Sequence, residues 1–309
     1  MRHIRGYLFV IIAVCGWATI GLFYRVLIER WAFEREVIVA YRAGLAAVLL
    51  LVGLAWRRPQ LLRVQWRDLP FFVGFGVLCV AGFYLIYIRA VQAGSVAQAA
   101  VLLYTAPFWI MGWSVLREGE RLTMRKVAAL LVAFVGCALV AGAYDRSQLR
   151  GNIGAIGWGL VSGLAYAVYS LGLRHGTRRG YSSWTVVTYT LLVGALVLCM
   201  VAPLEGLVRV WGLPQSWPYL LGTTVITSLI APIAYTLSLT LLPASTAAII
   251  ATLEPVLAGV LAWLVLGERL ALPQWLGVGC VFVAVASLAL AEGRTAVVPA
   301  NEPITNPTI

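Results

Sequence analysis

Aromatic and hydroxyl side chains recur at helical spacing inside apolar stretches of this sequence. Trp158, Ser162, Tyr166 and Tyr169 follow one another at intervals of three or four residues, which places them on one face of a helix. Such side chains combine apolar surface with hydroxyl and indole donors. A row of them in the middle of an apolar helix indicates a protein-lined, partly wet cavity, with helix packing as the alternative for any single residue.

Two charged residues stand in the middle of long apolar runs, where a charge is costly and needs a reason. Glu254 precedes Pro255, so its carboxylate has two possible roles. It receives a proton or a substrate ammonium, or it hydrogen-bonds the backbone groups that the proline leaves free, and we favour this structural role. Arg42 is the candidate counter-charge, for Glu254 or for a substrate carboxylate.

The side chains at helical spacing and the two charged residues in apolar runs give the candidate functional residues. The expected substrate-binding residues are Trp17, Arg42, Tyr84, Tyr87, Gln98, Trp109, Trp158, Ser162, Tyr166, Tyr169, Tyr235 and Glu254. The expected hinges are Pro107, Pro232 and Pro255, because each proline removes an intrahelical hydrogen bond. We expect no catalytic residues, no metal site and no cofactor, since the chain has two histidines and its five cysteines lie in apolar runs without CxxC spacing.

The amino-acid composition indicates whether the chain folds in water or in a lipid bilayer. Of 309 residues, 61% are hydrophobic and 11% charged, whereas a soluble domain has about 25% charged residues. The net charge of +11 comes from Arg in short loops between apolar runs, so it points to a membrane protein and not to a nucleic-acid partner.

Ten apolar runs are long enough to span a bilayer as helices. They cover residues 6–26, 37–56, 70–90, 95–116, 124–143, 152–173, 184–205, 217–238, 244–266 and 273–291. The fold expected is therefore an all-α integral membrane protein with ten transmembrane helices. The first run has no small-residue cleavage site and is expected to be retained. Residues 292–309, rich in Pro, Asn and Thr, are expected to form a disordered tail.

The chain repeats itself at an offset of 148 residues. Pro107 then aligns with Pro255, and Gly119-Glu120-Arg121-Leu122 aligns with Gly267-Glu268-Arg269-Leu270. We infer two five-helix repeats, residues 1–143 and 144–291. Because five is odd, the second repeat enters the membrane from the opposite side, and inverted repeats of this kind are typical of transporters.

Arg and Lys in alternate loops predict the orientation. The side with both termini carries 14 of them and the other side eight. Since positive loops stay inside, both termini are expected to be cytoplasmic, in the cell inner (plasma) membrane.

The repeated features resemble those of a known family. A Pro in the fourth helix of each half, a Gly-Glu-Arg-Leu turn before the fifth, and the segments 242–248 and 253–256 are similar to the EamA group of the drug/metabolite transporter superfamily. The overall pattern is most similar to that of the YddG-type bacterial amino-acid exporters. The first half departs from the second at one point, because Ala106 stands where Glu254 stands.

The resemblance and the inverted repeats lead to one functional expectation. It is a secondary transporter that exports small zwitterionic metabolites, most plausibly aromatic or other hydrophobic amino acids, by alternating access. Export of drugs or other small organic metabolites is the alternative within this class, and a channel is the alternative in another class. An enzyme is disfavoured because the two aspartates, Asp68 and Asp145, lie in loops. The partners expected are a small-molecule substrate and the lipid bilayer, with a monomer expected and a dimer as the alternative.

Overall fold

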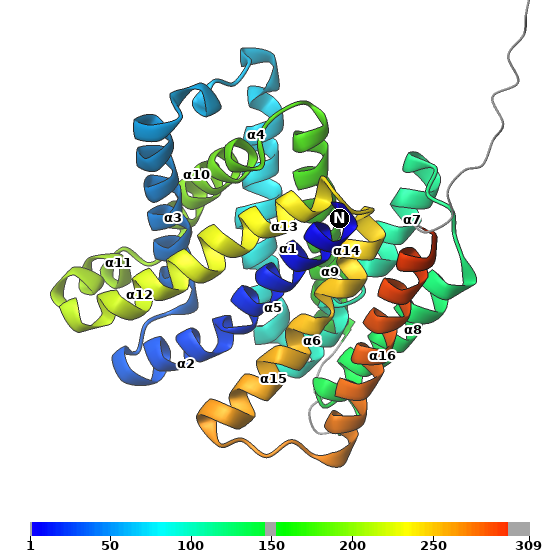
Figure 1. The fold of residues 1–309 in the computed structure, drawn as a ribbon. Coiled ribbons are helices and arrows are strands. Elements are labelled where there is room, and N and C mark those ends of the chain that lie inside the picture. The colour runs from blue at the N-terminus through cyan, green and yellow to red at the C-terminus, as the bar shows by residue number, and fades with distance from the viewer. Residues whose placement is uncertain (1, 146–152, 296–309) are drawn as a thin grey trace, which may run out of the picture.

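The computed structural model describes residues 2–145 and 153–295, and this part of the chain contains helices and turns but no strand (Figure 1). The first repeat contributes α1 (Arg2–Ala18), α2 (Ile20–Trp31), α3 (Arg35–Arg57), α4 (Leu69–Phe75), α5 (Gly82–Ala93), α6 (Val96–Leu103), α7 (Ala106–Glu118) and α8 (Met124–Val140). The second contributes α9 (Ile153–Arg178), α10 (Ser183–Val201), α11 (Leu204–Arg209), α12 (Trp217–Thr223), α13 (Ala231–Leu239), α14 (Ala244–Ala251), α15 (Leu253–Leu266) and α16 (Leu272–Thr295).

Nine stretches of the described residues are long and apolar enough to cross a membrane. The tenth expected run is α8, which at 17 residues lies at the lower limit for a bilayer span. The all-helical membrane fold is thus confirmed, while the count of ten stays a prediction. Helix α16 includes the first residues of the expected tail, and residues 296–309 lie outside the described part.

Both repeats interrupt their helices at equivalent places. The third span of each contains a π-helical segment, Gly76–Ala81 and Thr224–Ile230, at starting positions 148 residues apart. The fourth span is broken in both, between α6 and α7 and between α14 and α15. Broken helices and π segments in membrane proteins commonly mark binding sites, because they place free backbone groups inside the bundle.

The three candidate hinge prolines lie where helices begin. Pro107, Pro232 and Pro255 fall in the first turns of α7, α13 and α15. Pro107 and Pro255 follow the interruptions of the fourth spans, where a proline costs little because the first N–H groups of a helix lack an intrahelical partner. Pro232 instead continues the π segment, since the Ala231 N–H donates to the Ile226 carbonyl. The role of the three prolines as hinges stays a prediction.

Each Gly-Glu-Arg-Leu turn ends a helix. Gly119 and Gly267 have φ angles of 67° and 69° at the C-termini of α7 and α15. This left-handed conformation closes the helix and suits glycine, which has no Cβ.

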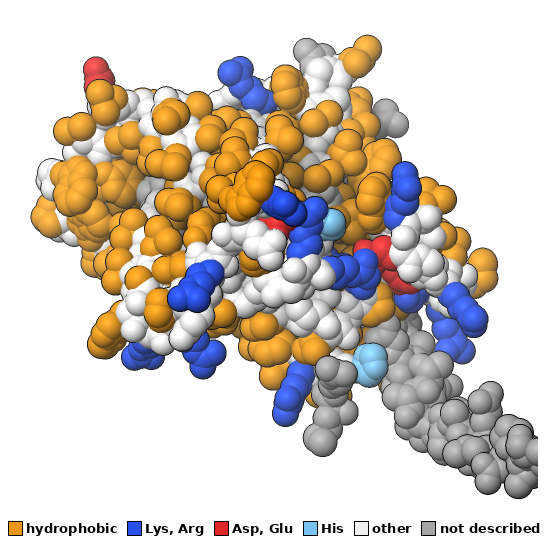
Figure 2. All heavy atoms as spheres, turned by 90° about the horizontal axis from the view of Figure 1, so that it is seen from above, with side chains coloured by type: hydrophobic (Ala, Val, Ile, Leu, Met, Phe, Trp, Pro, Cys, Tyr) orange, Lys and Arg blue, Asp and Glu red, His pale blue; other side chains and the backbone are white. Residues whose placement is uncertain are grey.

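Alternate connections meet at the same end of the bundle. At one end, which we call the closed end, Asp68 pairs with Arg179, and Glu118 pairs with Arg178 at 2.7 Å. Figure 2 looks at the molecule from this end, where Lys and Arg side chains gather around carboxylates. At the opposite end, Arg25 pairs with Glu268 at 2.7 Å. Each of these pairs joins the first repeat to the second.

The last helices of the two repeats, α8 and α16, lie side by side (Figure 1). Gly136 and Gly277 bring them close, because a Cβ on Gly277 would come within 2.6 Å of the Gly136 carbonyl oxygen. Small residues commonly allow such close packing between membrane helices.

Candidate substrate site

Seven aromatic residues from four helices form one contact network in the bundle interior. The Trp17 ring of α1 lies 5.2 Å from Tyr235 of α13 and 6.4 Å from Tyr166 of α9. Tyr166 continues to Tyr169 at 6.3 Å. We call this network the aromatic cluster: Trp17, Phe83, Tyr84, Tyr87, Tyr166, Tyr169 and Tyr235.

Phe83 connects the two repeats within the aromatic cluster, although it was not among the sequence candidates. Its ring lies 5.8 Å from Tyr166, 5.3 Å from Tyr84 and 6.3 Å from Tyr87. A spacing of four residues from Phe83 to Tyr87 was the signal that could have found it.

Arg42 joins the aromatic cluster from α3. Its side chain is only 2% exposed, its Nη2 donates a hydrogen bond to the Tyr84 hydroxyl, and its guanidinium carbon lies 4.9 Å from the Tyr84 ring and 5.9 Å from the Tyr24 ring. Its Nε has no hydrogen-bond partner, and no ion pair of Arg42 occurs within residues 2–145 and 153–295. A buried cation with unmatched donors attracts an anion.

Glu254 lies in the first turn of α15, directly after the break that follows α14. Among the described residues its carboxylate forms no ion pair and accepts no hydrogen bond from the freed backbone. The contacts expected of a purely structural role are therefore missing.

Besides Arg42 and Glu254, four sequence candidates lie outside the aromatic cluster. Ser162 donates to the Gly159 carbonyl at 2.6 Å, and Gly159 packs against Leu102 of α6. Gln98 is buried in the first turn of α6, where its backbone N–H donates to Ser95. Trp109 and Trp158 are 47% and 43% exposed. Neither tryptophan has a ring contact in the described part of the chain, and the exposure of Trp109 and Trp113 marks the lipid-facing side of α7.

The closed end seals the site on one side. Tyr235 and Ser170 are fully buried, and their hydroxyl oxygens lie 2.8 Å apart. Beyond them, Glu120 binds the Lys126 ammonium and accepts a hydrogen bond from Ser245 at the start of α14. Glu118 binds Arg174 as well as Arg178.

The turn at the opposite end, which we call the looser end, is more exposed. Glu120 and Glu268 occupy equivalent positions in the two repeats, but their side chains are 12% and 53% exposed. At the closed end, Glu120 of the first Gly-Glu-Arg-Leu turn is held by Lys126 and Ser245, and we call these contacts the latch. At the opposite end, Glu268 of the second turn is largely exposed to solvent.

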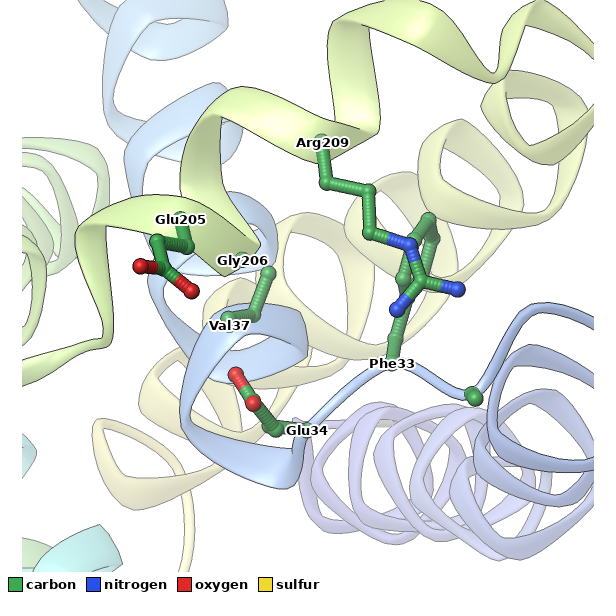
Figure 3. Close-up of a pocket in the computed structure, with 7 residues that line it drawn as sticks. Phe33, Glu34, Val37, Glu205, Gly206 and Arg209 are labelled. Carbon is green, nitrogen blue, oxygen red and sulfur yellow. The ribbon is translucent and has the colours of Figure 1, made fainter.

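A small pocket lies at this looser end (Figure 3). It has a volume of about 110 Å³ and is lined by Phe33, Glu34, Val37, Glu205, Gly206 and Arg209, with Ala32. Arg209 closes one wall by donating to the Trp31 carbonyl at 2.7 Å. None of the sequence candidates lines it, and it is separate from the aromatic cluster.

The chain is similar in sequence to several transporters from bacteria and an archaeon. It is 31% identical over 203 residues to an uncharacterized transporter of Archaeoglobus fulgidus, which covers 66% of this chain and 69% of that protein. It is 24% identical to the uncharacterized inner membrane transporter YicL of Salmonella typhimurium, over 94% of this chain and 97% of the relative. Similarity to YwfM, an uncharacterized transporter of Bacillus subtilis, is 27% over 88% and 89% of the two chains.

A solved crystal structure shares the fold, with a TM-score of 0.80 and 18% identity over 94% of this chain and 98% of that one. The family model of the EamA-like transporters matches twice, over residues 4–142 and 153–290. Both matches cover one set of spans with the same π segment and the same broken fourth span. The chain therefore belongs to the EamA-like transporter family and is a multi-pass membrane transporter.

Proposed function

We propose that this transporter exports small zwitterionic metabolites, foremost amino acids with aromatic or other hydrophobic side chains, across the cell inner membrane. YicL, which matches nearly the whole chain, is named as an inner membrane transporter, and this supports the location. The substrate class rests on the site.

The observation that carries the proposal is the buried guanidinium of Arg42. Its Nε–H has no partner among the described residues and lies beside the aromatic cluster, and a carboxylate is the small-molecule group that matches a guanidinium in charge and geometry. Glu254, in the first turn of α15, is the carboxylate proposed to bind an ammonium. The apolar ring faces of the aromatic cluster suit a hydrophobic side chain.

Phosphorylated substrates fit less well. A phosphate monoester carries about two negative charges, and Arg42 is the only cation that contacts the aromatic cluster within the described residues. A singly charged head group balances the site without a second cation.

The unequal ends of the bundle support a proposal of alternating access. The latched Glu120 and the exposed Glu268 occupy equivalent positions, so exchanging the environments of the two repeats closes the looser end and opens the closed one. With both termini cytoplasmic, the closed end is the cytoplasmic one and the site faces outward. An exporter in this state has released its substrate.

A competition panel tests the substrate class. Purified protein is incubated with labelled L-phenylalanine and an excess of unlabelled amino acids, monocationic drugs or sugar phosphates. Hydrophobic amino acids are expected to displace the label most strongly. Displacement by monocationic drugs alone would favour the alternative function, because Glu254 and the ring faces also form a site for an organic cation.

A further inference from the structure

The outer surface of the first repeat carries a groove that the substrate site does not use. It has a volume of about 310 Å³ and runs between α7 and α8. Its apolar walls include Met111, Gly112 and Val115 of α7, Val127 and Leu130 of α8, and Leu122 of the turn between them. Gly112 deepens the groove, since a Cβ there would meet no atom within 4 Å.

In the described part of the chain, two arginines without a paired carboxylate lie next to this groove, on the side of the closed end. Arg121 and Arg125 are exposed and form no ion pair within the described residues. The carboxylates of the same segment are already engaged, Glu118 by Arg174 and Arg178 and Glu120 by Lys126. The N-terminus of α8, which begins at Met124, adds the positive end of a helix dipole.

The second repeat provides an internal comparison. At the offset of 148, Val115 and Val127 correspond to Trp263 and Trp275, whose rings lie 5.6 Å apart in an edge-to-face contact. Arg125 corresponds to Pro273. Arg121 corresponds to Arg269, so one arginine is common to both repeats, whereas the groove without the tryptophan pair and the second arginine occur together only in the first repeat.

We propose that the α7–α8 groove binds one anionic phospholipid, with an acyl chain between the helices and the phosphate at Arg121 and Arg125. The groove opens on the lipid-facing surface beside the exposed Trp109 and Trp113, so acyl chains are the molecules that reach it. An apolar groove that ends at unpaired arginines matches an anionic lipid in both shape and charge.

Native mass spectrometry of the purified protein tests this proposal. The protein is titrated with dioleoyl phosphatidylglycerol and, separately, with dioleoyl phosphatidylcholine. The wild type is expected to retain phosphatidylglycerol selectively, and the double variant Arg121→Gln/Arg125→Gln is expected to lose about 30-fold in affinity for it. The matched control Arg57→Gln/Arg58→Gln removes two exposed arginines from the connection after α3 and should leave retention unchanged.

A second variant tests the groove itself. Val115→Trp/Val127→Trp copies the aromatic pair of the second repeat and should reduce retention of the lipid while the thermal unfolding temperature is kept. Equal retention of both lipids by the wild type, or an equal loss in the control, would overturn the proposal. So would conversion of a dimer to a monomer by the tryptophan pair without a change in lipid retention, because the groove would then be an interface between copies.

Discussion

Arg42 carries five N–H donors at a place where few polar partners exist, and its one side-chain hydrogen bond among the described residues goes to Tyr84. Unmatched donors on a buried charge cost free energy until an acceptor arrives. We predict that a substrate carboxylate supplies an acceptor for the Nε–H of Arg42, which is unpaired among the described residues, and that binding specificity at the scale of single residues depends on Arg42 and Glu254.

Three ligands distinguish the contribution of Arg42 to binding from that of Glu254. L-Phenylalanine carries both head groups, N-acetylphenylalanine lacks the ammonium, and phenethylamine lacks the carboxylate. Arg42→Gln should weaken binding of the first two by about 10- to 150-fold, and Glu254→Gln should weaken binding of the first and third, as expected for hydrogen bonds to charged groups. Isothermal titration checks this, with Arg89→Gln, an exposed position on α5, as the control. Unaltered affinity of Arg42→Gln for L-phenylalanine would contradict the assignment.

Tyr166 and Trp158 offer a matched pair on one helix. The Tyr166 hydroxyl is buried without a hydrogen-bond partner in the described structure, whereas Trp158 is exposed. Tyr166→Phe should leave the unfolding temperature unchanged or raise it, because no hydrogen bond is lost, and should weaken substrate binding. Trp158→Ala should leave affinity unchanged. Differential scanning fluorimetry and the binding assay measure both quantities, and a reversed pattern would place the site on the other side of α9.

At the scale of helices, the spacing of residues along the sequence predicted which side chains share a helix face. It did not predict which neighbouring helix that face packs against. Tyr166 and Trp158 belong to the same row, yet one joins the aromatic cluster and the other is exposed. The choice depends on the packing of helices from both repeats, as between α1 and α13, which no local pattern encodes. The prolines predicted hinges, and two of them lie next to the interruptions of the fourth spans, whereas the π segments had no comparable signal.

The unequal Gly-Glu-Arg-Leu turns make a prediction about helix movement. Glu120→Gln removes the charge that holds Lys126 and Ser245, so it should open the closed end, while Glu268→Gln should not, because Glu268 is exposed. Ser170→Cys, buried behind the latch, reports the opening through its rate of labelling by a charged thiol reagent. A rise of about tenfold or more is expected with Glu120→Gln. Equal labelling in both variants would show that the latch does not hold this end.

At the scale of the whole molecule, composition and the internal repeat predicted the membrane fold because both follow from the bilayer itself. Apolar runs must be helical there, and an odd number of spans must invert the second copy. The substrate had no comparable constraint, because one fold can carry many different sets of side chains at the centre of the bundle. Specificity of the YddG type therefore stays a prediction.

The orientation can be tested directly. With 14 Arg and Lys on one side and eight on the other, both termini should be cytoplasmic. Green fluorescent protein fused after residue 300 should fluoresce, and alkaline phosphatase fused there should be inactive. The opposite pattern would reverse the direction assigned to the closed end.

Counterflow in proteoliposomes tests the central claim most directly. Vesicles are loaded with unlabelled L-phenylalanine and diluted into a trace of the labelled compound, with membrane current recorded in parallel. A carrier with one alternating site should accumulate label transiently above equilibrium, and Arg42→Gln should abolish this overshoot. Equilibration without an overshoot, accompanied by a high-conductance current, would contradict alternating access and identify a channel.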